Sequence, residues 1–214
     1  MLQIQLNGCG KNYQKQWLFR NLTANLNINP GDSLAILGKN GSGKSTLTLL
    51  LTGQISPTEG SINWIINDKK IDEFQWHNHY SLSSPSLELP EELTLIEWFQ
   101  FQSKIKPFYD FVDLEYLLST CNFSTITANK AIGNYSSGMK QRVKLCLSIL
   151  TNTPLSIIDE PFSNLDSEGI DLYYSLIEKF QQQKFFVIAS NRSEEYTFAK
   201  SRIQIENGEI SFQN

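Results

Sequence analysis

The chain of 214 residues has little cysteine and no long apolar run. Its three cysteines show no Cys-x-x-Cys spacing, which argues against a metal or redox motif and predicts ordinary buried thiols. The longest apolar stretches, such as 185–189, are far too short to cross a bilayer. The first residues, 1–6, alternate like a strand and lack the plan of a signal peptide. We therefore expect a cytosolic protein that needs another chain to act at a membrane.

Basic charge is also scarce. The 18 Lys and Arg residues are outnumbered by 22 Asp and Glu residues, which gives a net charge of -4 at pH 7. No run of Lys and Arg marks a surface for nucleic-acid phosphates or anionic lipid, so we expect no nucleic-acid partner. The length allows a full α/β core, and we expect one domain over residues 1–214.

What the sequence does contain is a glycine-rich motif for binding phosphate. A short apolar run, 33–37, is followed by G-x-x-x-x-G-K-S over 38–45 and then by a helical pattern. Glycines let the backbone fold so that successive N–H groups face phosphate oxygens, and the new helix offers its N-terminal N–H groups to the same anion. A chance glycine-rich turn would lack this strand-to-helix setting. We predict a nucleoside triphosphate site formed by Gly38, Lys39, Asn40, Gly41, Ser42, Gly43, Lys44, Ser45 and Thr46.

Four side chains have predicted chemical roles. Lys44 would reach the β- and γ-phosphates, and the Ser45 hydroxyl would ligate Mg²⁺. Asp159 ends the apolar run 155–159, where its hard oxygen suits Mg²⁺ directly or through a water. Glu160, the next residue, could polarise the water that attacks the γ-phosphate, as a general base. An Asp-Glu pair alone is weak evidence, but at the end of a buried strand after such a loop it is strong.

A third stretch, 134–142, precedes a helical pattern. Ser136 suits the N-cap of that helix, and the small residues beside it leave backbone N–H groups free for an anion. On these residues alone, a plain helix cap is the favoured interpretation.

The apolar periodicity predicts the fold class. Alternation over 2–7 and about 22–28 indicates antiparallel strands, and Asn207-Gly208 indicates a terminal hairpin. From about 85 to 134 the apolar residues, many of them aromatic, recur at helical spacing, and Phe111 and Leu114 belong to one such pattern. We expect the aromatics of this stretch to form the core of a helical insert, with a docking patch for a partner as the alternative.

We therefore expect an α/β fold: a P-loop NTPase core with an antiparallel β subdomain and an inserted helical subdomain. The core would comprise 1–84 and 151–214, and the helical subdomain about 85–150.

The order of the motifs resembles the ATP-binding cassette family, specifically the nucleotide-binding subunit of ABC transporters, over essentially the whole chain. Residues 136–141 are similar to its signature loop in a divergent form, and 163–166 match its D-loop closely. The resemblance implies that two cassettes pair head to tail, so that the ATP held by Lys44 of one is covered by the signature loop of the other. The contacting residues of that loop would be Ser136, Ser137 and Gly138.

Further expectations follow from the same resemblance. The ligands would be ATP and Mg²⁺, and the partners a second cassette, identical or different, and separate transmembrane permease subunits. The protein would lie peripherally at the inner face of the cell membrane through such a partner. Tyr13 matches the aromatic that the family places against adenine, and Trp17 is a second candidate, since a ring face suits stacking on a base.

Two residues that the family normally carries are missing. A Gln that helps to hold Mg²⁺ and the attacking water is replaced by Ser83 or Ser84, whose side chains are too short for the same reach. A His that contacts the γ-phosphate is replaced by Asn191, which donates a hydrogen bond but carries no charge. Arg192 could supply that charge, which we treat as a secondary hypothesis. We expect ATP binding with little loss and slowed hydrolysis.

Three functions compete. The leading one is the ATPase subunit of a membrane transporter, and the alternative is a nucleotide-gated dimerisation switch with slow or no hydrolysis. A cassette protein acting on DNA or ribosomes is disfavoured, because those relatives carry two cassettes or a long coiled coil and this chain is acidic. The transported substrate would be set by the membrane subunits; the length, close to a bare cassette, favours an exporter over an importer.

Overall fold

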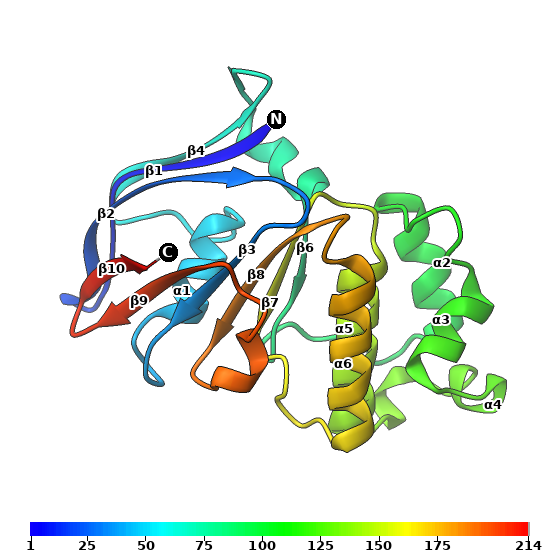
Figure 1. Ribbon diagram of the computed structural model, residues 1–214. Coiled ribbons are helices and arrows are strands. Elements are labelled where there is room, and N and C mark those ends of the chain that lie inside the picture. The colour runs from blue at the N-terminus through cyan, green and yellow to red at the C-terminus, as the bar shows by residue number, and fades with distance from the viewer. Residues whose placement is uncertain (214) are drawn as a thin grey trace.

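Two β-sheets organise the computed structural model, which describes residues 1–213 (Figure 1). The first is antiparallel, with strand order β2-β1-β4-β5. Its strands are β1 (Leu2–Tyr13), β2 (Gln16–Ile28), β4 (Glu59–Ile66) and β5 (Lys69–Lys70). The predicted antiparallel subdomain is confirmed.

The strands β1 and β2 are longer than the alternating pattern indicates. Their pairing shifts register between Leu6 and Cys9, and Gly8 lies there with a φ of +59°. A bulge adds an unpaired residue and changes which side chains face the core, so the two-residue alternation stops while the strand continues.

The second sheet has the order β10-β9-β3-β8-β7-β6, and all neighbours are parallel except β10 and β9. Its strands are β3 (Ser33–Leu37), β6 (Tyr80–Ser83), β7 (Leu155–Asp159), β8 (Phe185–Ser190), β9 (Ser201–Glu206) and β10 (Glu209–Gln213). β9 and β10 form the predicted hairpin, with Asn207 and Gly208 at positive φ in its turn. Because parallel strands end at the same edge, the segments that follow β3, β6, β7 and β8 meet there.

The helices cover the parallel sheet on both faces (Figure 1). They are α1 (Lys44–Leu51), α2 (Leu95–Ile105), α3 (Leu114–Cys121), α4 (Thr125–Ala128), α5 (Ser137–Leu150) and α6 (Ser167–Phe180). Short 3₁₀ helices are η1 (Glu73–His79), η2 (Ile132–Asn134) and η3 (Ser193–Tyr196). Phe111 lies before α3 and not within it, because Asp113 caps that helix by accepting a hydrogen bond from the Tyr116 N–H at 2.7 Å.

Two apolar clusters hold the layers together. One joins the antiparallel sheet, α1 and one face of the parallel sheet, and in it the Trp64 indole donates to the Leu51 carbonyl at 3.1 Å. The other joins the opposite face to α5, α6 and the helical insert. The predicted core role of the insert's aromatics holds for Phe99, which stacks on Phe108 with ring centroids 4.8 Å apart.

The cysteines Cys9, Cys121 and Cys146 are free and buried, as predicted. Within residues 1–213, no helix has both the length and the apolar character that a membrane span requires.

Candidate nucleotide site

The glycine-rich loop joins β3 to α1 at the edge where the parallel strands end. Gly43 occupies the N-cap of α1 with a φ of +106°, a conformation that side-chain-bearing residues rarely adopt. A Cβ at this position would lie 3.2 Å from the Phe19 ring and 3.3 Å from the Leu18 Cβ. The close approach of β2 to the loop therefore requires glycine here.

Lys44 is held inside this loop. Its side chain is 5% exposed, and its ammonium donates to the carbonyls of Gly38 at 2.9 Å and Lys39 at 3.2 Å. Ser45, the next residue, is exposed at the first turn of α1. The loop thus presents a fixed cation, an accessible hydroxyl and the free N–H groups of a helix N-terminus, a combination suited to binding a polyphosphate.

The acidic end of β7 lies beside this loop. Asp159 is 2% exposed, and burial raises the pKa of its carboxyl, while the neighbouring Ser45 and Ser84 hydroxyls act in the opposite direction. Glu160 follows with a φ of +47°, where its carbonyl accepts the Ser163 N–H at 3.0 Å. At this sharp turn, directly after Asp159 and Glu160, the chain leaves the direction of β7.

A pocket of about 430 Å³ brings the predicted residues together. Gly41, Lys44 and Ser45 line it from the loop, and Glu160 lines it from the end of β7. The predicted base thus shares one space with Lys44 and with Ser45, one of the two predicted metal ligands, although it is more than 110 positions away in the chain.

The structure fits a magnesium ion between loop and strand. Asp159 Oδ1 is buried and has no hydrogen-bond partner within residues 1–213, and this carboxylate lies next to the Ser45 hydroxyl. No cluster of three or more His, Cys, Asp or Glu residues in the described chain could hold a metal ion by itself. Mg²⁺ keeps several waters and binds through one or two protein oxygens together with substrate phosphates, so this sparse donor set suits it.

Asn191 also reaches the loop. It follows β8, and its Nδ2 donates to Asn40 Oδ1 at 2.8 Å, so the amide is placed against the phosphate-binding segment. Arg192 is exposed and is not among the residues lining the pocket. Its supply of charge to the site stays a prediction.

Of the two serines in place of the expected glutamine, Ser84 contacts the predicted metal ligand Asp159. Its Oγ donates to Asp159 Oδ2 at 3.4 Å, whereas the buried Ser83 Oγ has no partner in the described chain. The ammonium of Lys144, from α5, donates to the carbonyls of Ser84 at 3.1 Å and Pro85 at 3.3 Å. Lys144 thereby fixes the segment next to Asp159, the predicted metal ligand, a role that nothing in its sequence context indicates.

The predicted signature residues lie apart from this pocket. Ser136 caps α5 by accepting the Met139 N–H at 3.2 Å, which confirms its cap role. Ser136 and Ser137 are exposed, and Gly138 packs closely on Asn164, whose carbonyl would lie 2.9 Å from a Cβ on that glycine. None of the three lines the pocket of Lys44 in the same chain.

The two adenine candidates lie on the hairpin of β1 and β2. Tyr13 is exposed with the Lys11 ammonium 5.4 Å from its ring centroid, and Trp17 has the Arg20 guanidinium 4.3 Å from its ring. Neither ring lines the pocket, to which Leu18 contributes from this hairpin. Their stacking on a base stays a prediction.

A buried glutamate behind the pocket, Glu195, is another residue that sequence reasoning missed. Its neighbour Glu194 is exposed, and two acids in succession after a strand are typical of a solvated turn. Only the fold distinguishes one from the other.

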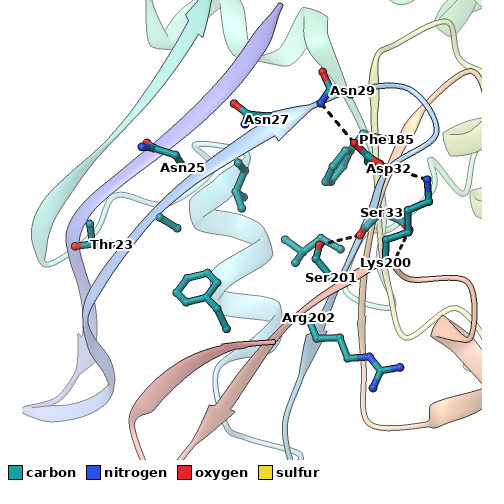
Figure 2. A pocket seen from close by; sticks show the side chains of 14 residues that line it. Thr23, Asn25, Asn27, Asn29, Asp32, Ser33, Phe185, Lys200, Ser201 and Arg202 are labelled. Atoms are coloured by element: carbon teal, nitrogen blue, oxygen red, sulfur yellow. Dashed lines mark hydrogen bonds and ion pairs between the residues drawn. The ribbon is translucent and has the colours of Figure 1, made fainter. Parts of the chain in front are cut away.

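A second pocket, of about 450 Å³, lies away from these residues (Figure 2). Side chains of β2, among them Thr23 and Asn25, line one wall, and Lys200 lies opposite, paired with Asp32 at 3.4 Å. None of the sequence-predicted site residues takes part in it.

Comparison with known proteins identifies the family of this chain. The ABC transporter family model matches residues 22–163, more than half of the chain. The chain is 30% identical over 201 residues to the lantibiotic transport ATP-binding protein SrtF of Streptococcus pyogenes, covering 89% of this chain and 80% of that protein. It is 29% identical over 211 residues to the uncharacterized ABC transporter ATP-binding protein YxlF of Bacillus subtilis (strain 168), covering 94% of this chain and 67% of that protein.

Solved structures agree on the fold. A dimeric ATP-binding cassette in a post-hydrolysis state, bound to ADP and Pi, superposes with a TM-score of 0.80 at 22% identity, covering 99% of this chain and 98% of that one. The expected P-loop NTPase fold and the resemblance stated from the motifs are both confirmed. The chain belongs to the ABC transporter family, as an ATP-binding protein and an ATPase.

Proposed function

We propose that two cassettes, each with the nucleotide site described above, close around ATP, hydrolyse it, and thereby drive separate membrane-spanning permease subunits. The observation that carries this proposal is the shared pocket in which Lys44 and Ser45 face Glu160. An intact phosphate loop and a carboxylate at the position of a general base are the minimum that hydrolysis requires.

The residues have distinct parts in this reaction. Lys44 and the N–H groups of the loop bind and orient the β- and γ-phosphates, and Glu160 accepts a proton from the attacking water. Ser45 and Asp159 would hold Mg²⁺, which neutralises charge on the phosphates when bound. The exposed Ser136 and Ser137, together with the half-buried Gly138, would cover the nucleotide of a second cassette.

At two positions the chain lacks the residue that the family normally carries, and the contacts made there favour slow ATP hydrolysis over none. Ser84 still contacts Asp159, and Asn191 still contacts the phosphate loop. Each retains a polar link but lacks reach or charge, so the transition state receives weaker electrostatic stabilisation.

A groove of about 290 Å³ beside the helical insert is a candidate contact surface for a partner protein. It is lined by Leu82, Trp98, Phe101 and Ile105, of which Phe101 is 50% and Ile105 56% exposed. The Trp98 Nε1 is buried without a hydrogen-bond partner in residues 1–213. We place the permease contact on this groove, which would hold this cassette peripherally at the inner face of the membrane.

Co-purification tests that contact. Phe101→Glu should abolish recovery with the permease subunits and leave the turnover of the isolated cassette unchanged. Phe74, which is 87% exposed and lies outside the groove, provides the matched control Phe74→Glu. Equal recovery of both variants with the permease would refute the placement.

Steady-state ATP turnover with Mg²⁺, beside size-exclusion chromatography with and without ATP, tests the main proposal. Lys44→Ala serves as the blank. Turnover that rises with protein concentration, together with an ATP-induced dimer, would support the proposed ATPase.

Glu160→Gln should abolish turnover and trap the ATP-bound dimer, because the amide cannot accept the proton. Tight ATP binding with no turnover above the blank would favour the dimerisation switch, and unchanged turnover in Glu160→Gln would refute the base assignment.

A further inference from the structure

Glu195 is an acid buried directly behind the candidate site. It lies in η3 and is 2% exposed. Burial raises the pKa of its carboxyl, and the donors Ser190 and Phe162 act in the opposite direction. Burying a carboxyl group is unfavourable unless the group is hydrogen-bonded. The two hydrogen-bond partners of Glu195 therefore show which segments of the chain it holds in place.

One carboxylate oxygen holds the segment that follows β7. Glu195 Oε1 accepts the backbone N–H of Phe162 at 3.0 Å, and Phe162 comes two residues after Glu160. The Phe162 ring also packs edge-on against Tyr173, with centroids 5.4 Å apart. The orientation of the turn that carries Glu160 therefore depends on this contact.

The other oxygen holds the segment that follows β8. Glu195 Oε2 accepts the hydroxyl proton of Ser190, a fully buried residue at the end of that strand. Ser190 directly precedes Asn191, whose amide contacts Asn40 of the phosphate loop. The second contact therefore fixes the arm that carries Asn191.

We propose that Glu195 is a positioning residue for ATP hydrolysis, which bridges these two segments and thereby fixes the positions of Glu160 and Asn191 at the site. The inference rests on the proposed function, since it assigns Glu195 to the same reaction. Glu195 does not contact the pocket itself. A positioning role predicts a loss in kcat at unchanged ATP affinity, because the phosphate loop and Lys44 remain in place.

Two substitutions of Glu195 distinguish a positioning role in hydrolysis from an effect on the stability of the fold. Glu195→Ala removes both acceptors, and we expect kcat to fall about 10- to 100-fold with KM for ATP within about twofold of the original value. Glu195→Gln keeps the bridge: its carbonyl oxygen accepts from Phe162, and its amide donates to the Ser190 hydroxyl, which can still donate to the Arg192 carbonyl. We expect the Gln variant to retain kcat within about threefold.

The matched control is Glu194→Ala, on the exposed neighbouring residue of η3, which should leave kcat unchanged. Thermal melting and ATP titration accompany each variant. If Glu195→Ala does not fold, Ser190→Ala replaces it, because that variant breaks only the link to the Asn191 arm and should lower kcat several-fold at unchanged affinity.

The proposal is overturned if the truncated variant keeps its kcat, if it loses ATP affinity instead, or if Glu195→Gln is as slow as Glu195→Ala. Failure of the proposed function looks different. If the unaltered protein turns over no faster than Lys44→Ala, both proposals fall. If Glu160→Gln abolishes turnover while the Glu195 variants stay as fast as the original, the positioning role alone falls.

Discussion

Asn191 is the residue at which this site departs most from its family in charge. Its neutral amide faces Asn40 of the phosphate loop at 2.8 Å, where an imidazolium would offer a charged donor to the developing phosphoryl charge. We expect Asn191→His to raise kcat roughly tenfold near pH 6, where the imidazole is largely protonated, and less near pH 8. Steady-state turnover at both pH values measures the effect.

The neutral variant Asn191→Gln is the control, since it changes the length of the side chain and adds no charge. A histidine variant no faster than the original protein at the lower pH would show that charge at this position does not limit the reaction. Replacing Arg192 by Ala tests the secondary hypothesis in the same assay, because a fall in turnover would mean that Arg192 already supplies that charge.

The sequence was sufficient to find the residues whose chemistry is tied to local spacing. Lys44 and Ser45 belong to one motif, and Asp159 and Glu160 adjoin at the end of an apolar run, so a single strand-to-loop pattern identifies each pair. Glu195 acts through partners that are 33 and 5 residues away, and no period or motif encodes such a link.

Elements carry a second kind of information, because one residue can both begin a helix and contact a ligand. Ser136 caps α5 and is also predicted to cover the ATP of a second cassette. We expect Ser136→Ala to lower the free energy of unfolding by about 1 kcal/mol and also to weaken the ATP-induced dimer. Urea unfolding and size-exclusion chromatography measure the two effects.

Ser136→Asp separates them. An aspartate caps a helix as well as serine does, so stability should be preserved, whereas its charge would repel the phosphates of the partner's nucleotide. An aspartate variant that still dimerises with ATP would argue that the N-terminus of α5 does not contact nucleotide.

Element types were predicted more reliably than element ends. The buried strand β7 lies at 155–159, where the apolar run predicts a strand. The ends of β1 and α3 were misplaced because a bulge at Gly8 and a cap at Asp113 interrupt the apolar pattern without leaving a signal in it.

The stability of the whole molecule should depend on pH through a buried lysine. Lys184 is fully buried, its ammonium donates to the carbonyls of Thr151 and Ser148, and burial lowers its pKa to about 7, assisted by the like charge of Lys106. The unfolded chain keeps that proton up to a pKa of about 10.4, so between about pH 7 and pH 10 it binds more protons than the folded chain. The free energy of unfolding should therefore rise with pH across this window.

Urea unfolding at several pH values across this window measures the slope, which for one proton is at most about 1.4 kcal/mol per pH unit. Lys184→Met should give a flatter profile, because the titrating group is gone. Lys106, whose pKa is lowered to about 8 by burial, would contribute to the slope that remains. An unchanged slope in Lys184→Met would contradict the assignment.

The position of β3 in the parallel sheet has a consequence for biosynthesis. This strand, which carries the phosphate loop, pairs on one side with β8 and on the other with β9, and both are made from the last 30 residues of the described chain. A ribosome that has made the loop at 38–46 still adds well over a hundred residues before either neighbouring strand exists. Pairing across such distances is slow to form. The segment that binds the nucleotide is thus made long before the two strands that give it its working shape.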